Sequence, residues 1–136
     1  MITAVDTNIL LDVFGADQTF GPGSRDLLRR CLMEGGVVAS DVVWSEISGS
    51  FPSSKAAQEG MSKLNIEFGS IGQEAALTAG RVSKSYRERG GKRERMIADF
   101  LIGAHAATHA ERLLTRDRGF YRTYFPRLRI LDPVRK

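Results

Sequence analysis

Residues 2–12 have the sequence ITAVDTNILLD. The apolar run Ile2–Val5 is too short for a helix and predicts a buried strand that ends at the acidic residue Asp6. A helix is expected to begin at Ile9, so Asp6 and the two polar residues after it could simply cap that helix. A ligand site is the second explanation, because ligands of open parallel sheets collect beyond the carboxyl ends of the strands.

The same alternation of short apolar runs and longer helical segments continues along the chain. Strands alternating with helices predict βαβ units, and therefore an α/β fold with a mostly parallel sheet covered by helices on both faces. The expected strands are Val37–Ala39, Ile66–Phe68, Leu113–Thr115 and Leu128–Leu131; the expected helices are Asp26–Met33, Val42–Ser48 with a continuation past Pro52 left open, Gln73–Arg89 and Arg95–His109.

The composition is that of one ordinary globular domain. The chain has 136 residues, of which 42% are hydrophobic and 26% charged, so residues 1–136 are expected to form a single domain. The single cysteine, Cys31, is expected to be a small core residue. We expect a cytoplasmic protein with no membrane partner, because the sequence shows no secretory signal and no apolar segment long enough to span a bilayer.

Positive charge is concentrated in one segment of the chain. The net charge is +4, and residues 81–95 contain seven Lys and Arg residues against two Glu residues. Such a segment could bind a polyanion, although a solvated helix surface explains it about equally well.

Three further carboxylates occupy positions that a parallel fold can bring toward Asp6. Asp117 comes two residues after an expected strand, where capping of the next helix is the competing explanation. Glu46 lies within an expected helix, where a single Glu usually faces solvent. Asp99 lies at the edge of an apolar helical stripe, so it is expected to be half buried and to need a partner. The stripe consists of Met96, Phe100, Gly103, Ala104 and Ala107.

A cluster of carboxylates repels itself unless a cation accompanies it. Oxygen-rich sites of this kind suit Mg²⁺ or Mn²⁺, which are held by a few carboxylates together with several waters. Such ions can activate a water molecule and neutralise the charge that builds on a phosphoryl group. The acidic residues therefore indicate a metal-dependent phosphodiesterase, with one metal ion or two left open.

Four parts of the chain, taken in order, form a set of motifs. They are Val5–Asp12 (VDTNILLD), Glu46, Ala98–Ala106 (ADFLIGAHA) and Leu114–Phe120 (LTRDRGF). These motifs resemble those of the PIN-domain family, in particular the VapC-type toxins. The resemblance implies a three-layer α/β/α Rossmann-like domain and an endoribonuclease that depends on Mg²⁺ or Mn²⁺. It further implies a protein that is usually dimeric and is silenced by a small VapB-like antitoxin encoded beside it.

The resemblance also assigns roles to six polar residues. The catalytic, metal-binding acids are Asp6, Glu46, Asp99 and Asp117, and the residues that orient ligands or water are Asn8 and Thr115. Asp41 is an alternative to Glu46, because the sequence after Glu46 has little of the family's aliphatic run. Water activated by the metal is expected to attack the scissile phosphorus, and the family resemblance implies a 5′ phosphate product.

The expected RNA-binding residues are Arg89, Lys92, Arg93 and Arg116, within the basic segments Lys84–Arg95 and Arg112–Arg129. Arg116 could contact a substrate phosphate or pair with a carboxylate. The antitoxin is expected to cover the basic groove and the acidic pocket, with an Arg inserted among the carboxylates. The target RNA, and the choice between a dimer and a higher oligomer, stay open.

Other functions fit parts of the sequence. A haloacid-dehalogenase phosphatase requires a second acid where Asn8 stands, whereas a non-catalytic RNA-binding or protein-interaction module with the same fold is the main alternative. His105 and His109 have i, i+4 spacing, but Ala106 replaces the Glu of the metalloprotease pattern, so both are expected on the surface. Tyr121 and its aromatic neighbours are expected to pack against the last strand rather than stack on bases.

Overall fold

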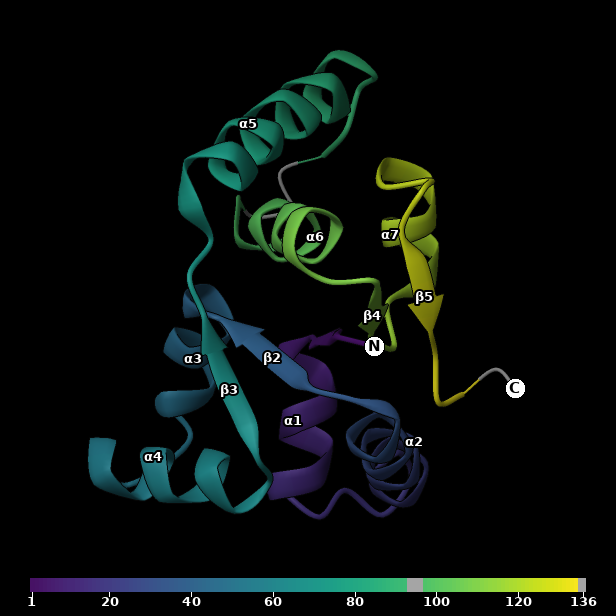
Figure 1. The fold of residues 1–136 in the computed structure, drawn as a ribbon. Coiled ribbons are helices and arrows are strands. Elements are labelled where there is room, and N and C mark those ends of the chain that lie inside the picture. The colour runs from purple at the N-terminus through teal and green to yellow at the C-terminus, as the bar shows by residue number, and fades with distance from the viewer. Residues whose placement is uncertain (93–96, 135–136) are drawn as a thin grey trace.

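The protein contains a five-stranded sheet in which each strand is parallel to its neighbours (Figure 1). The computed structural model describes residues 1–92 and 97–134. The strand order is β3-β2-β1-β4-β5. The strands are β1 (Thr3–Val5), β2 (Val37–Ser40), β3 (Ile66–Gly69), β4 (Arg112–Leu114) and β5 (Arg129–Leu131). The prediction of an α/β fold with a mostly parallel sheet is therefore confirmed.

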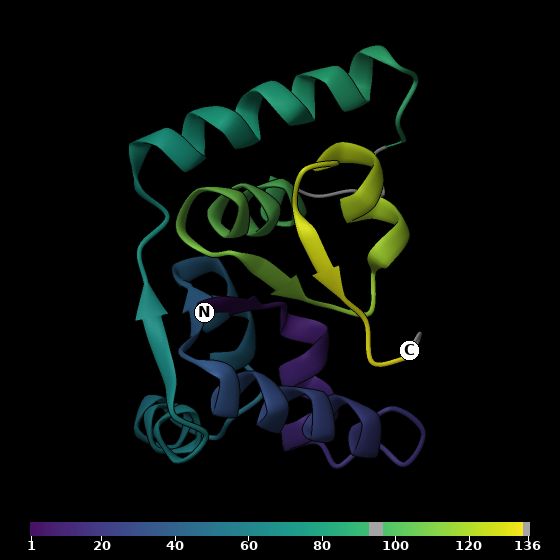
Figure 2. The same ribbon diagram turned by 45° about the vertical axis from the view of Figure 1, so that its right-hand side comes forward.

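The helices form two layers, with α1 to α4 on one face of the sheet and α5 to α7 on the other (Figures 1 and 2). This division follows from right-handed crossovers, because the chain advances from β1 through β2 to β3 and then crosses back to β4 and β5. The helices are α1 (Thr7–Phe14), α2 (Gly21–Glu34), α3 (Asp41–Ser48), α4 (Ser54–Lys63), α5 (Gly72–Glu88), α6 (Ile97–His109) and α7 (Arg118–Tyr124).

Capping residues set the start of two helices that differ from expectation. α1 begins at Thr7, two residues before the expected start, because the Asp6 carboxylate accepts a hydrogen bond from Thr7 N at 2.7 Å. The chain past Pro52 forms a separate helix, α4, whose N-cap is Ser53. A continuous helix is unfavourable there, because proline has no N–H and clashes with the preceding turn.

Two further helices have boundaries that the apolar spacing did not give. α2 begins at Gly21 and has Pro22 in its first turn, where the missing proline N–H has no intrahelical partner to lose. α6 is described from Ile97, and the expected helix residues Arg95 and Met96 lie outside the described residues.

Helix α6 is buried on more than one side, because it lies on the sheet and α5 packs along its outer surface. As a result His105 is 2% exposed, and the prediction that it lies on the surface is wrong. Ala107, which was expected in the apolar stripe, is exposed. His109 is exposed as expected, and Cys31 is buried in the core as expected.

Arg112 marks the edge of the sheet opposite to the carboxyl ends of the strands. Its guanidinium is buried and donates hydrogen bonds to Thr3 Oγ1 at 2.8 Å and to Glu34 Oε1 at 2.5 Å. The expectation that Arg112 belongs to an RNA-binding segment is therefore wrong. Local sequence does not reveal this role, because the partner of Arg112 is Glu34 at the end of α2, 78 residues away along the chain. Across residues 1–92 and 97–134, no helix combines the length and apolar character needed to cross a bilayer.

Candidate functional site

Asp6 lies at the carboxyl end of the central strand β1 and is 6% exposed. Its Oδ1 accepts the Thr7 backbone N–H, and its Oδ2 accepts the Thr115 hydroxyl at 2.7 Å and the Asn8 amide at 3.3 Å. The donors that the described residues give to Asp6 are thus neutral groups. They hold the carboxylate in one orientation without cancelling its charge.

Asn8 and Thr115 join the ends of the two neighbouring strands β1 and β4. The Asn8 amide nitrogen is 3.4 Å from Thr115 Oγ1, and its oxygen accepts the Arg116 backbone N–H at 3.2 Å. Thr115 Oγ1 also accepts the Asp117 backbone N–H at 3.0 Å. Asn8 and Thr115 therefore hold the side chain of Asp6, and Thr115 also holds the backbone at Asp117.

Asp99 and Glu46 lie close enough to Asp6 for their charges to act on it. Burial raises the pKa of Asp6 to about 6, and the charges of Asp99 and Glu46 contribute to the rise. Hydrogen bonds from Thr115 and Thr7 oppose this rise in pKa because they stabilise the charged carboxylate. The three acids come from the end of β1, the first turn of α6 and the exposed surface of α3.

Of the two candidate acids around α3, the structure connects Glu46 to the site. Glu46 Oε1 accepts the Thr7 hydroxyl at 2.7 Å, one residue from Asp6. Asp41 is the first residue of α3, and its charge acts on the buried His105, whose pKa is lowered by burial and by His109. These contacts place Glu46, rather than Asp41, beside Asp6.

Asp117 and Tyr121 lie one helical turn apart at the start of α7. The Asp117 side chain makes no helix-capping hydrogen bond, so capping does not account for it. Tyr121 is 0% exposed, and its hydroxyl has no hydrogen-bond partner among the described residues. Burial raises the pKa of Tyr121, and the charges of Asp6, Asp99 and Asp117 add to the rise. Asp6 is near enough to contribute to this pKa shift, but its contact with the hydroxyl lacks hydrogen-bond geometry.

The acids that the sequence assigned to one site therefore lie around the same end of the sheet. As the side chains lie, no group of three or more His, Cys, Asp or Glu among residues 1–92 and 97–134 has the spacing to hold a metal ion. The donor set is nonetheless all oxygen, which suits Mg²⁺ or Mn²⁺. Mutual repulsion at Asp6 and the unpaired Tyr121 hydroxyl both fit a site that binds a ligand.

The motifs and the fold lead to the same family. A model of the PIN domain matches residues 3–126. The chain belongs to the PIN-domain family. No curated protein gives a significant match to this PIN domain.

Among solved structures, this PIN domain is similar to a chain in the structure of VapBC2 from Rickettsia felis, which is bound to a DNA fragment from the VapBC2 promoter. The TM-score is 0.75, with 18% identity over 97% of this chain and 98% of the other. It is also similar to FitAcB from Neisseria gonorrhoeae, with a TM-score of 0.72 and 19% identity over 100% of both chains. A toxin-antitoxin complex from Klebsiella pneumoniae gives a TM-score of 0.72 and 20% identity, over 96% and 97% of the two chains. At these identities the likeness shows a shared fold.

Tyr86 links Lys92, at the end of the described part of the basic segment, to helix α6. The Tyr86 hydroxyl on α5 donates to the Lys92 carbonyl oxygen at 2.6 Å. The ring of Tyr86 packs against that of Phe100 with 5.4 Å between centroids. The exposed residues Arg89 and Lys92 therefore lie near the start of α6. Arg93, the third predicted RNA-binding residue of this segment, lies outside the described residues.

Arg116 pairs with a carboxylate, which is one of the two roles that the sequence left open. Its Nε and Nη2 atoms donate to the two oxygens of Asp12 at 2.7 and 3.0 Å. The guanidinium also lies 4.0 Å from the ring centroid of Phe20, and Asp12 accepts the Ser24 hydroxyl. This cluster joins α1, the start of α2 and the chain that follows β4.

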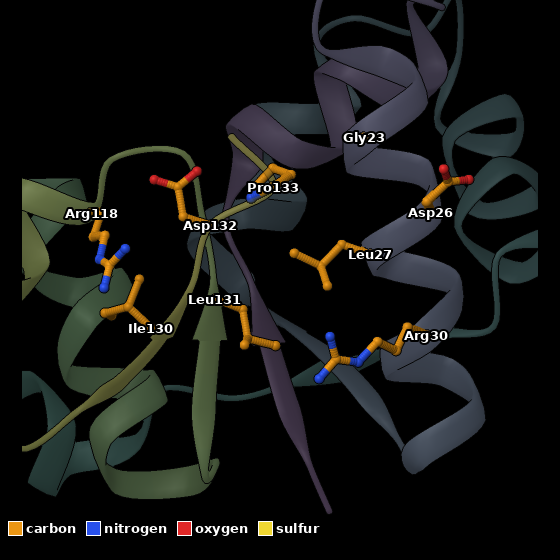
Figure 3. Close-up of a pocket in the computed structure, with 9 residues that line it drawn as sticks. All are labelled: Gly23, Asp26, Leu27, Arg30, Arg118, Ile130, Leu131, Asp132 and Pro133. Carbon is orange, nitrogen blue, oxygen red and sulfur yellow. The ribbon is translucent and has the colours of Figure 1, made fainter. Parts of the chain in front are cut away.

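A groove of about 630 Å³ lies between α2 and β5, apart from the four acids (Figure 3). Leu27 and Leu131 face each other across it, and Arg118 and Asp132 line one side. Arg118 directly follows Asp117, so the groove borders the candidate site through the start of α7. The sequence did not predict this groove, because its two walls are far apart along the chain.

Proposed function

We propose that this PIN domain is an endoribonuclease that depends on Mg²⁺ or Mn²⁺, and that it is the toxin of a toxin-antitoxin pair. The observation that carries the proposal is the buried Asp6 carboxylate, whose pKa is raised to about 6 by burial with contributions from Asp99 and Glu46. A buried charge surrounded by like charges destabilises the fold unless a cation accompanies it. The arrangement of Asp6, Asp99 and Glu46 therefore lowers the stability of the protein without a cation and favours binding of one.

The four acids would divide the work of holding the cation. Asp6 and Asp99 would hold the principal ion, and Asp117 and Glu46 would bind it through water or support a second ion. When bound, such an ion lowers the pKa of a coordinated water and neutralises charge on a phosphoryl group. Asn8 and Thr115 keep Asp6 oriented through their hydrogen bonds, so the site needs little rearrangement around its central carboxylate.

The exposed cations near the start of α6 would bind the RNA backbone. Asp99 lies seven positions after Lys92, so the chain between them spans at most about 24 Å. The Tyr86 hydroxyl donates to the Lys92 carbonyl oxygen, and the Tyr86 ring packs on Phe100, the residue after Asp99. Phosphates of an RNA strand bound by Arg89 and Lys92 would therefore lie within a few nucleotides of the acids, and this binding would weaken as salt rises.

We also propose that residues 1–136 form one domain, that it dimerises, and that a VapB-like antitoxin inhibits it. The structures of similar fold include VapBC2 bound to promoter DNA and a toxin-antitoxin complex. A protein partner that inserts an Arg among the acids would compensate their charge as a cation does. Such a partner would explain how a nuclease is kept inactive in the cell that makes it.

Cleavage of a mixed RNA substrate by the purified protein tests the nuclease. We expect discrete fragments with Mg²⁺ or Mn²⁺, none with EDTA, and none from Asp99→Asn. Asp26→Asn is the matched control, because it makes the same chemical change on the exposed surface of α2 and should cleave like the wild type. Fragments that persist with EDTA or in Asp99→Asn would contradict the assigned site. Intact RNA in every lane would favour the non-catalytic module.

A further inference from the structure

The hydroxyl of Tyr121 lies near Asp6, Asp99 and Asp117, while its ring is packed in the core. It lies four residues after Asp117, and residues with this spacing share one face of a helix. Its ring contacts those of Phe120 and Phe125, with centroids 5.0 and 6.3 Å away. The ring is therefore held on both sides along α7, and the hydroxyl has little freedom to turn toward solvent.

Without a ligand, burial of the unpaired Tyr121 hydroxyl lowers the stability of the fold. A buried donor that lacks an acceptor loses its hydrogen bond to water and gains none in return. Phenylalanine would fill the same space without this loss. The other buried aromatic residues of the cluster, Phe100, Phe120 and Phe125, carry no hydroxyl, whereas Tyr86 and Tyr124 are only partly buried. The hydroxyl of Tyr121 is thus a specific feature of this wall of the site rather than a packing requirement.

The surroundings of the hydroxyl keep it a donor. The carboxylates of Asp6, Asp99 and Asp117 all lie near enough to the hydroxyl for their charges to act on it. An ionised phenol among carboxylates would add to their repulsion, whereas a neutral phenol presents its O–H to any oxygen that enters between them. A water or a phosphate oxygen brought in with a cation has the lone pairs to accept it.

We propose that Tyr121 is a positioning residue whose hydroxyl donates a hydrogen bond to an oxygen that enters the carboxylate site together with a divalent cation. The oxygen belongs either to water or to an RNA phosphate. The proposal rests on the proposed metal-dependent activity, and it goes beyond the acidic set by adding a neutral donor to it. The hydroxyl would fix where that oxygen lies relative to Asp6 and Asp117.

The substitution Tyr121→Phe removes the hydroxyl and keeps the ring. Tyr124→Phe is its matched control, because Tyr124 lies on the same helix and packs on Phe100 and Phe120 without being assigned to the site. Three quantities are measured for the full chain: thermal stability in EDTA, Mn²⁺ affinity by calorimetry without RNA, and kcat and KM for cleavage of RNA.

We expect Tyr121→Phe to be at least as stable as the wild type in EDTA, because an unpaired donor has been removed. If the oxygen belongs to water, the Mn²⁺ affinity of Tyr121→Phe falls by about three- to tenfold, the equivalent of one hydrogen bond. If it belongs to RNA, Mn²⁺ affinity is unchanged and kcat falls by a similar factor at constant KM. Tyr124→Phe should match the wild type in both measurements.

Tyr121→Phe that equals the wild type in Mn²⁺ affinity and in kcat would overturn the inference. The same holds if Tyr124→Phe gives the same losses, because the effect would then belong to packing of α7. Failure of the proposed function looks different: the wild-type protein itself would neither bind Mn²⁺ nor cleave RNA. The two failures are therefore distinguished by the wild-type measurements.

Discussion

The substitution Asp6→Asn is expected to stabilise the protein when no divalent cation is present. The carboxylate is 6% exposed, and its pKa in the folded protein is raised from 3.8 to about 6. Between these two pH values the folded state binds more protons than the unfolded state. Stability therefore falls as the pH rises from about 4 to about 6 and stays low above that range.

The magnitude follows from the pKa difference. A rise of about 2.2 pH units corresponds to about 3 kcal/mol of lost stability at neutral pH. Asn removes this loss and can still accept the Thr7 N–H. Its amide group would take the place of Oδ2, where the Thr115 hydroxyl can turn to accept from it but the Asn8 amide, also a donor, cannot. Losing that contact costs about 1 kcal/mol, so the expected net gain is about 2 kcal/mol. For a chain of 136 residues this gain raises Tm by about 6 °C.

The assay is urea denaturation in EDTA at pH 7.5 and at pH 5.0. At pH 5.0 most Asp6 in the folded wild type is already protonated, so the gain from Asp6→Asn should shrink by about 1.4 kcal/mol. Asp26→Asn, on an exposed part of α2, is the control and should change stability by less than about 0.5 kcal/mol at either pH. With saturating Mn²⁺ the order should reverse, because the wild type alone keeps a full set of acids.

Two results would refute this reasoning. The first is a loss of stability in Asp6→Asn at pH 7.5 in EDTA with the control unchanged. It would mean that the hydrogen bonds to Asp6 outweigh its burial and the neighbouring charges. The second is a stability difference that does not change between pH 7.5 and pH 5.0, which would mean that Asp6 does not titrate in this range.

Three further outcomes follow from the same contacts. Asp12→Ala leaves the Arg116 guanidinium without its carboxylate and should lower the free energy of unfolding by about 2 kcal/mol, after allowance for partial exposure of the arginine; a loss below 0.5 kcal/mol in urea denaturation would contradict this. Gly103→Ala places a Cβ against the ring of Phe125, closer than van der Waals contact allows, and should destabilise by about 1–3 kcal/mol, so an unchanged Tm would show that the ring moves freely. Mn²⁺ affinity should be about tenfold weaker at pH 5.0 than at pH 7.5, because Asp6, with a pKa of about 6, must lose a proton to bind; equal affinities in calorimetry would exclude Asp6 as a ligand.

The sequence predicts the strand ends better than it predicts the helix surfaces. Asp6 and Asp117 follow strands in a fixed way, so their positions at one edge of the sheet follow from topology alone. His105 was misplaced because the spacing argument assumes that a surface helix buries one face. α6 carries apolar or small residues almost all round, from Phe100 to Ala106, and α5 covers its outer side. A helix of this composition is better treated as a buried one.

Contacts between distant parts of the chain account for most of what the sequence did not give. The sequence places Arg112 in a segment expected to bind RNA, but its guanidinium pairs with Glu34, 78 residues away along the chain. The partner of Arg116 was left open for the same reason, since Asp12 lies 104 residues earlier. The direction of the Tyr121 hydroxyl depends on how α7 is rotated against the sheet, and no local pattern encodes that rotation.

The two arginines and the acids together show how the fold distributes charge around its sheet. At the amino edge, Arg112 is neutralised by Glu34, so this buried charge is compensated within the chain. At the carboxyl edge, Arg116 lies next to Thr115, yet its guanidinium goes to Asp12 and not to Asp6. Asp6 receives neutral donors from the described residues, although an arginine is one residue from its hydrogen-bond partner. An arrangement selected for stability would pair the nearest cation with the buried acid whose pKa is raised. Directing that cation to Asp12 leaves Asp6 without a cationic partner among the described residues, which agrees with the proposal that a divalent cation compensates its charge.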